Sequence, residues 1–334
     1  HCGTYLRKAL VNHSHLVTDA RSKLYPIPYP ADHDFTTKLD TATPPATEAE
    51  QHRLSNQMKI NYRQVIGLWI WPMIKCRPDI SFHISKLSQS LANPAKEHYE
   101  AIKLLSQYLA MTIEEGLYFW RDEPRMDLPE GPIPSTYPDQ YKFHLDFTDL
   151  EHLLYALSDS DWASCRKTRN AITGAIVMLA GAAIGYKTKF QKAVALSSTE
   201  AEWVAACEVG KMILYFRSLL EDLGQPQHNA TVMFEDNRGA LFMANAQQAS
   251  TRTRHIDIKH FALVDWVEQD LMILEEIKTA ENSADAMTKA TAKILFYRHM
   301  DTIMGRRKPK HVERTFTKQQ QQRSQQNCNT PVSH

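Results

Sequence analysis

Four acidic residues in the second half of the chain have types and spacing that could support phosphodiester chemistry. They are Asp159 in SDSDWA, Glu202 in SSTEAEW, Asp236 in FEDN and Asp285 in NSADAMTK. Carboxylates that converge on one spot repel one another at pH 7 unless divalent cations neutralise them. Two such ions on one phosphodiester activate water on one side and stabilise the leaving oxygen on the other. The four residues therefore predict a two-ion hydrolytic site, provided that the fold brings them together.

The alternation of apolar residues indicates where two of these carboxylates point. Asp159 continues an apolar row that begins at Leu153 and follows every second residue of an extended strand. Asp161 has the same parity, so parity alone leaves both aspartates open as the ligand. Asp236 continues a similar row in the stretch TVMFED. Because successive side chains alternate between the faces of a strand, Glu235 is expected to point away from Asp236.

Helical phase separates the two glutamates of TEAE. From Glu202, steps of three and four follow an apolar stripe as far as Leu220, which predicts that Glu202 heads the buried face of a helix. Glu200 lies roughly 200° around the axis from Glu202. It completes a capping box with Ser197, and this structural role needs no catalytic function.

The same patterns predict the architecture around these residues. A last helix has Ser283 as its expected N-cap and Asp285 in its first turn, where the helix dipole alone favours an acidic residue. Taken by itself, Asp285 therefore has a structural interpretation. Three strands followed by an alternation of helices and strands predict an α/β fold with a mixed five-stranded sheet and helices on both faces. The expected strands are 153–160, 172–180, 184–196, 231–236 and 272–278, with helices at 198–223, from 237 and at 257–269.

These motifs resemble the ribonuclease H domain of Pol polyproteins from copia-type LTR retrotransposons. The matching stretches cover about residues 153–290 and follow the family's order: SDSDWA, KFQKAVALSSTEAEW, EDNRGAL, TRTRHIDIKHF and SADAMTK. The resemblance implies a ribonuclease H-like sheet and favours Asp159 over Asp161. It assigns metal-binding and catalytic roles to Asp159, Glu202, Asp236 and Asp285.

The resemblance also implies a reaction and its partners. The expected enzyme is an endonuclease that hydrolyses the RNA strand of RNA–DNA hybrids during reverse transcription, with two Mg²⁺ ions that Mn²⁺ can replace. It would recognise the hybrid by backbone shape and 2′-hydroxyl groups. Further partners are the upstream reverse transcriptase and integrase portions of the same polyprotein. In cellular ribonucleases H a histidine-bearing loop precedes the last aspartate, whereas 278–285 holds no histidine. This departure argues against a histidine proton shuttle.

A helical pattern in 61–120 precedes this region and resembles the thumb or connection end of a copia-type reverse transcriptase. The matching stretches are IGLWIWP, RPDISF and NPAKEHYEAIKLLSQYL, with an expected helix break at Pro72. The paired-aspartate motif of such polymerases does not occur upstream, so polymerase activity is not expected. The predicted division of the chain is a weakly structured 1–60, the helical 61–120, a Pro-rich linker 121–145, the ribonuclease H domain 146–305 and a disordered basic and Gln-rich tail 306–334.

Two basic clusters are candidates for contact with nucleic acid phosphates. Lys187, Lys189 and Lys192 flank the third strand, and an ordinary solvated face is an equally good interpretation of them. The second cluster comprises Arg252, Arg254, His255 and Lys259. No Cys/His set with zinc-like spacing accompanies its histidine, which argues against a zinc site.

Composition limits these interpretations. At 334 residues, 43% of them hydrophobic, the chain has room for about two domains. Its net charge of +1 means that contact with nucleic acid must come from local patches. The richest apolar stretch, 65–74, is shorter than the ~20 residues of a membrane span. The chain begins with His1 and shows no signal-peptide pattern, which suggests a piece of a longer product located in the cytoplasm, in virus-like particles, or in the nucleus.

Two alternative functions remain open from the sequence. Integrases and transposases built on the same fold carry the order Asp…Asp…Glu, and the order Asp…Glu…Asp…Asp argues against them. The other alternative is a decayed or domesticated fragment that acts as a non-catalytic nucleic-acid-binding or dimerisation module. The presence of all four carboxylates weakens this second alternative.

Overall fold

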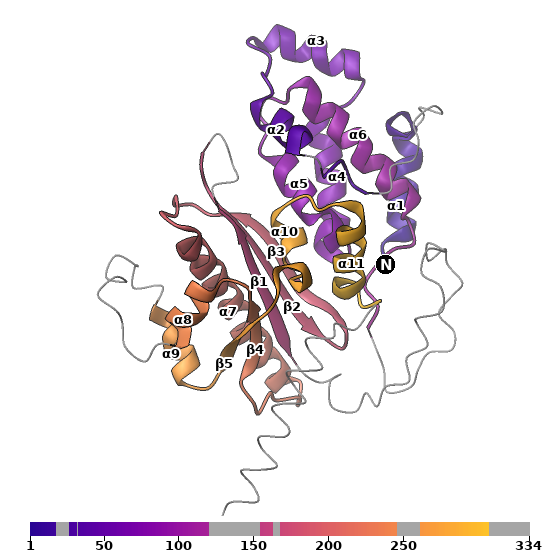
Figure 1. Ribbon diagram of the computed structural model, residues 1–334. Helices are drawn as coiled ribbons and strands as arrows, with labels where there is room; N and C mark the ends of the chain where they lie inside the picture. Colours follow the sequence, from indigo (N-terminus) through magenta and orange to yellow (C-terminus); the bar gives the residue numbers. More distant parts are fainter. Residues whose placement is uncertain (18–26, 32, 120–153, 163–167, 246–260, 307–334) are drawn as a thin grey trace, which may run out of the picture.

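One mixed sheet of five strands forms the centre of the molecule (Figure 1). The computed structural model describes residues 1–17, 27–31, 33–119, 154–162, 168–245 and 261–306. The strand order is β3-β2-β1-β4-β5; β2 is antiparallel to β1 and β3, whereas β4 is parallel to β1 and β5. The predicted α/β fold is therefore confirmed. The strands are β1 (Tyr155–Asp161), β2 (Ile172–Leu179), β3 (Ala182–Phe190), β4 (Thr231–Glu235) and β5 (Met272–Glu276).

Helices cover both faces of this sheet, as predicted. Alternate residues of β1 enter different cores: Tyr155 and Leu157 pack in one, whereas Leu154, just before β1, and Ala156 pack in the other. The face that carries Ala156 lies under α7 (Ser198–Asp222), with α8 (Arg238–Asn245) and α9 (Phe261–Glu268) on the same side. The opposite face carries α10 (Asp285–Thr288) and α11 (Lys293–Ile303) (Figure 1).

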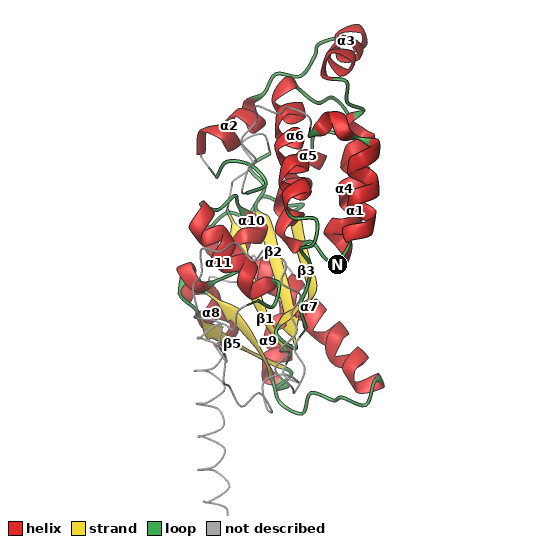
Figure 2. Ribbon diagram, turned by 90° about the vertical axis from the view of Figure 1, so that its right-hand side faces the viewer, coloured by secondary structure: helices red, strands yellow, loops and turns green. Residues whose placement is uncertain are grey.

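Six α-helices within the described part of 1–119 form a helical block above the sheet (Figures 1 and 2). The expectation of weak structure in 1–60 is not met by its described residues, because Leu6, Leu16 and Tyr29 are almost completely buried in the same core as 61–120. Residues that lie far apart in the sequence thus pack in one apolar core. The helices are α1 (Gly3–Asn12), α2 (His33–Thr41), α3 (Glu48–Met58), α4 (Tyr62–Lys75), α5 (Ser81–Ser88) and α6 (Lys96–Met111).

Pro72 lies inside α4, so the expected break at this residue is wrong. The helix begins after Asn61, whose side-chain oxygen accepts the N–H of Gln64 at 3.2 Å, and it continues to Lys75. Proline has no N–H and leaves the carbonyl four residues earlier, that of Leu68, without its helical donor. The hydroxyl of Tyr5 on α1 donates to this carbonyl at 3.0 Å. A tertiary contact therefore supplies the donor that the proline removes.

The helical block is joined to the sheet through β3 and α10. The Tyr186 hydroxyl on β3 donates to the Met73 carbonyl of α4 at 2.7 Å. The Ser81 hydroxyl on α5 donates to Thr188 at 3.1 Å, and the Thr188 hydroxyl donates to the Met287 carbonyl of α10 at 2.7 Å. Apolar residues of the block, the sheet, α10 and α11 form one continuous core. The block therefore supports the short helix that begins with Asp285.

Several predictions from the sequence concern other parts of the chain. The expected linker 121–145 and the tail from 307 onward lie outside the described residues. Within the described part, no helix combines the length and the apolar character that crossing a bilayer requires.

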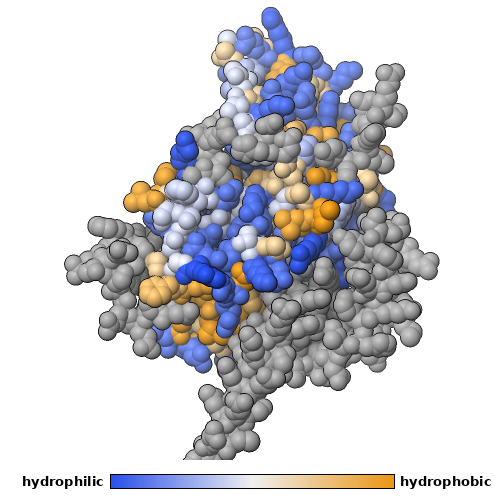
Figure 3. Space-filling model, viewed as in Figure 1, coloured by the Kyte–Doolittle hydropathy of each residue, from blue (hydrophilic) through white to orange (hydrophobic). Residues whose placement is uncertain are grey.

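Figure 3 shows mainly hydrophilic side chains over the helical block, with smaller hydrophobic groups nearer the sheet.

Candidate metal centre

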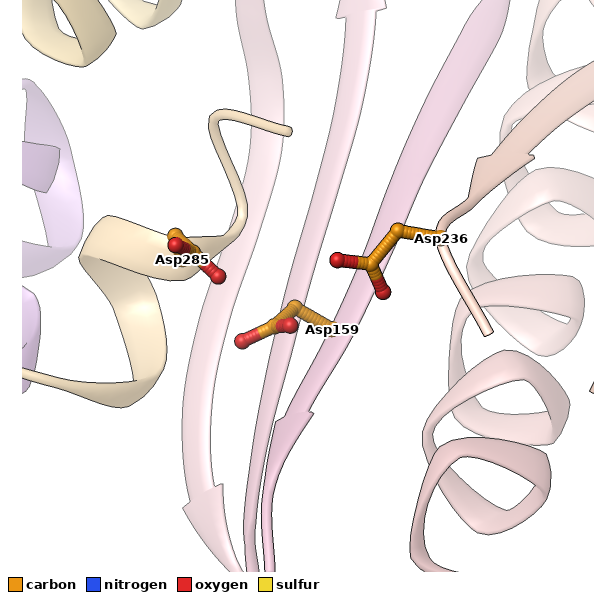
Figure 4. A group of neighbouring side chains, drawn as sticks. All are labelled: Asp159, Asp236 and Asp285. Atoms are coloured by element: carbon orange, nitrogen blue, oxygen red, sulfur yellow. The ribbon is translucent and has the colours of Figure 1, made fainter. Parts of the chain in front are cut away.

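Three aspartates meet where β1 and β4 end (Figure 4). β1 and β4 are parallel, and Leu157 of β1 lies opposite Phe234 of β4. Asp159 and Asp236 each follow two residues later, so both lie at the same end of the sheet. Asp285 reaches them from the first residue of α10. One carboxylate oxygen of each lies within 4.8 Å of the others. We call Asp159, Asp236 and Asp285 the α10 group.

A second group of carboxylates lies beside the first and shares Asp236 with it. Its other members are Glu202, in the first turns of α7, and Glu235, the last residue of β4. One carboxylate oxygen of each member again lies within 4.8 Å of the others. We call Glu202, Glu235 and Asp236 the α7 group.

The four expected site residues therefore come together as two overlapping groups rather than as one cluster. Asp159 faces the α10 side of the sheet, whereas Glu202 approaches from the α7 side. Asp236 follows the end of β4 and lies between them. Asp161, which shares the parity of Asp159, belongs to neither group among the described residues.

The two glutamates of TEAE occupy the positions predicted from helical phase. Glu202 is buried against the sheet, with 6% of its surface exposed. The Ser197 hydroxyl accepts the N–H of Glu200 at 3.1 Å, which is the expected N-cap. The Glu200 carboxylate accepts the N–H of Leu196 at 2.7 Å. Glu200 therefore ties down the start of α7 and does not join either carboxylate group among the described residues.

The sequence patterns assign Glu235 no role at the site, because the parity of one strand does not show which helix covers each of its faces. Met233 packs in the α7 core, on the other face from Phe234, as the alternation predicts. Glu235 does not end up away from Asp236, however, because one carboxylate oxygen of each lies within 4.8 Å of the other. Glu202 heads the sheet-facing stripe of α7. The strand alternation that directs Glu235 to one face and the helical period that directs Glu202 to the sheet would, if combined, place the two glutamates beside each other.

Asn282, which the sequence patterns did not single out, holds the start of α10 in place. Its side chain is completely buried, donates to the Ser158 carbonyl of β1 at 2.8 Å, and accepts the N–H of Ala284 at 3.2 Å. The N-cap of α10 is Ala284, without a side-chain cap, so the expected capping role of Ser283 is wrong. The orientation of Asp285 depends on the anchoring of this turn to β1.

Electrostatic repulsion and burial act together at the site. Burial, and then the charge of Asp285, raises the pKa of Asp159 to about 8. Burial, and then the charges of Glu235 and Asp159, raises the pKa of Glu202 to about 11. The pKa values of Glu235 and Asp285 are also raised, mainly by burial. Lys289 opposes the shift at Asp285, since its Nζ lies 2.9 Å from Asp285 Oδ1. Such crowding of buried carboxylates is unfavourable without nearby positive charge.

The donors of both groups fit a hard divalent cation. Every member offers carboxylate oxygen, the ligand that Mg²⁺ and Ca²⁺ prefer. The Oε2 atoms of Glu202 and Glu235 are buried and accept no hydrogen bond from any described residue. Buried oxygens without donors are costly, and a cation between them would remove that cost. The two groups are therefore able to bind metal ions.

Close packing of α10 against β2 is possible only because residue 174 is glycine. Gly174 lies opposite Asp159 in the β1–β2 pair. A Cβ atom at this position would lie 2.7 Å from Thr288 Cγ2, 2.8 Å from the Ala284 carbonyl oxygen and 2.9 Å from Met287 Cβ. Both ends of α10 would have to move away from the sheet to accept it.

Gly174→Ala should therefore cost about 1–3 kcal/mol of the free energy of unfolding, because overpacking displaces α10. The same displacement should weaken Mn²⁺ binding, since Asp285 moves with the helix. The measurements are urea unfolding and calorimetric Mn²⁺ titration. Gly67→Ala is the control: apart from its chain neighbours and the backbone of its own helix, no atom lies within 4 Å of its added Cβ, and alanine should stabilise α4 by roughly 0.5–1 kcal/mol. Wild-type stability and Mn²⁺ affinity in Gly174→Ala would contradict this role.

The structure describes only one of the two basic clusters that were expected to contact phosphates. Lys187 and Lys189 both pair with Glu208 of α7, with Nζ to Oε2 distances of 3.1 and 3.5 Å. Contact of these lysines with nucleic acid stays a prediction. Lys192 is exposed. The second cluster, Arg252, Arg254, His255 and Lys259, lies outside the described residues.

Comparisons with known proteins show the relatives of this chain. No family model matches it. It is 30% identical over 259 residues to the retrovirus-related Pol polyprotein from transposon TNT 1-94 of Nicotiana tabacum, a match that covers 78% of this chain and 17% of the relative. It is 28% identical over 248 residues to that from transposon RE1 of Arabidopsis thaliana, covering 74% and 15%.

Among solved structures, LC11-RNase H1, isolated from compost, aligns with 41% of this chain and 93% of its own length, at 11% identity and a TM-score of 0.32. The chain spans less than a fifth of the length of the Pol polyproteins that it matches. These sequence matches cover about three quarters of the chain. By this sequence similarity, the chain belongs to the retrovirus-related Pol polyproteins of copia-type transposons.

Proposed function

We propose that this part of the polyprotein is a ribonuclease H, a metal-dependent endonuclease that hydrolyses the RNA strand of RNA–DNA hybrids. The observation that carries the proposal is the pair of carboxylate groups that share Asp236 at the ends of β1 and β4. Two adjoining carboxylate groups suit chemistry in which two divalent cations act on one phosphodiester. The sequence resemblance in SDSDWA, TEAEW, EDN and SADAMTK supports the same reaction.

Each proposed ligand has a structural reason for its position. Asp159, Asp236 and Asp285 would hold one Mg²⁺ ion, and Glu202 with Asp236 would hold the other. When bound, the ions would activate water and stabilise the leaving oxygen. The hydroxyl of Thr288 donates to Asp159, and Lys289 pairs with Asp285. These contacts orient the two aspartates and offset part of their charge.

The hybrid substrate and the other partners are inferred from the resemblance. Recognition would depend on backbone shape and 2′-hydroxyl groups rather than base edges, so sequence preference should be weak. The helical block would represent the thumb or connection end of a reverse transcriptase whose upstream portions, with the integrase, belong to the same polyprotein. The proposed setting is cytoplasmic, within virus-like particles, or nuclear.

The test is cleavage by the purified full chain. In Mg²⁺ or Mn²⁺ it should cut the RNA strand of a labelled hybrid and leave duplex DNA intact. EDTA should lower the rate by about 10³-fold or more, because metal stabilisation of the transition state is worth several kcal/mol and each ~1.4 kcal/mol is tenfold. Cleavage that persists unchanged in EDTA would refute the mechanism. Hybrid binding without cleavage in either metal would favour the non-catalytic binding module instead.

A further inference from the structure

Glu235 is a fifth carboxylate at the site, and the family resemblance gives it no role. It is the last residue of β4 and is completely buried. Its carboxylate lies with those of Glu202 and Asp236, with one oxygen of each within 4.8 Å of the others. The side chain points to α7, away from Asp159.

Among the described residues, the α7 group has no basic side chain like the one that supports the α10 group. Asp285 has an ion pair with Lys289, and Asp159 accepts a hydrogen bond from Thr288. By contrast, neither Glu202 nor Glu235 has an ion pair with any described residue. Of the two groups, the α7 group therefore has fewer charged partners among the described residues for its carboxylates when they ionise.

Two buried oxygens also remain open on this side. Glu235 Oε1 accepts the N–H of Asn237 at 3.2 Å, which fixes the carboxylate in one orientation. Its Oε2 atom has no hydrogen-bond partner among the described residues, and neither has Glu202 Oε2. A carboxylate with one oxygen tied to the backbone and the other open is prepared to donate that oxygen to a cation.

We infer that Glu235 is a metal ligand, which together with Glu202 and Asp236 forms a second cation site that shares only Asp236 with the α10 group. The inference rests on the proposed function, which requires divalent cations at these carboxylates. It extends the expected set of four acidic ligands to five. The side chain of Glu235 then determines the affinity for the ion on the α7 side, while the ion on the α10 side depends on it only through Asp236.

Mn²⁺ binding to the full chain tests this inference, with calorimetry for stoichiometry and electron paramagnetic resonance for coupling between neighbouring ions. Wild type should bind two coupled Mn²⁺ ions. Glu235→Gln should weaken one of them by at least about tenfold, the scale on which groups supporting a metal act, and remove the coupling signal. The other ion should bind with nearly wild-type affinity. The glutamine can still accept the N–H of Asn237, so the fold should remain, as circular dichroism can verify.

Two further variants make the result specific. Glu276→Gln, on the neighbouring strand, changes a half-exposed glutamate that pairs with Arg238, and it should bind both ions as wild type does. Glu235→Asp keeps the charge but shortens the reach, so it should weaken the same ion as Glu235→Gln. If Glu235→Gln binds both ions with wild-type affinity, the inference is wrong. If wild type binds no Mn²⁺, the proposed function itself fails.

Discussion

Glu202→Gln should lower metal-dependent RNA cleavage by about 10³-fold or more, while Glu200→Gln keeps most of the activity. The first change removes a charge from a buried carboxylate that lies beside Asp236. The second leaves a side-chain oxygen that can still accept the N–H of Leu196. Its cost should be below about 1 kcal/mol, the ordinary range for helix caps.

Thermal unfolding of the same variants provides a second readout. Burial and neighbouring charges raise the pKa of Glu202 in the fold to about 11, above its unfolded value. The protonated form is therefore the one that the fold favours, and the stability associated with it is lost as pH rises from about 4 toward the folded pKa. In metal-free buffer, Glu202→Gln should raise the melting temperature more at pH 9 than at pH 5. An inactive Glu200→Gln beside an active Glu202→Gln would reverse the assignment of the two glutamates.

Arg77→Met should destabilise the chain by about 3–5 kcal/mol, because it leaves a buried carboxylate without its cation. Arg77 and Asp79 are both fully buried, and the guanidinium donates to both carboxylate oxygens at 2.7–3.1 Å. Arg77 also donates to the Thr112 carbonyl at 2.8 Å, which joins the end of α4 to the end of α6. The Tyr108 hydroxyl, which donates to Asp79 at 2.7 Å, cannot supply the missing charge.

Guanidinium chloride unfolding is the measurement for this variant, and Arg7→Met is its control. Arg7 pairs with Glu114 at the surface, where both side chains are about half exposed, so its loss should cost less than about 1 kcal/mol. Since the helical block and the sheet share one core, circular dichroism and tryptophan fluorescence should report one transition. Equal stabilities for Arg77→Met and Arg7→Met would show that the buried pair contributes little.

Local periodicity in the sequence was sufficient to predict most strands of the sheet and the direction of some side chains at the site. Alternation predicted that Asp159 and Asp236 each continue an apolar row of a strand, and the 3.6-residue period separated Glu202 from Glu200. These predictions succeeded because side-chain direction within one strand or helix depends only on that element. The sequence resemblance added Asp285, whose position in a first helical turn had suggested only a structural role.

Tertiary structure decided the relations between elements. It placed Asp159 and Glu202 on opposite sides of one sheet and brought Glu235 into the α7 group. It also allowed α4 to continue past Pro72, because the Tyr5 hydroxyl donates to the carbonyl that the proline leaves without a helical donor. A period shows which residues share a face, but it does not show which other element covers that face. Which element covers a face depends on packing between residues far apart in the chain. Burial, charge repulsion and hydrogen bonding all contribute to that packing. The division of the carboxylates into two groups therefore exists only in the folded molecule.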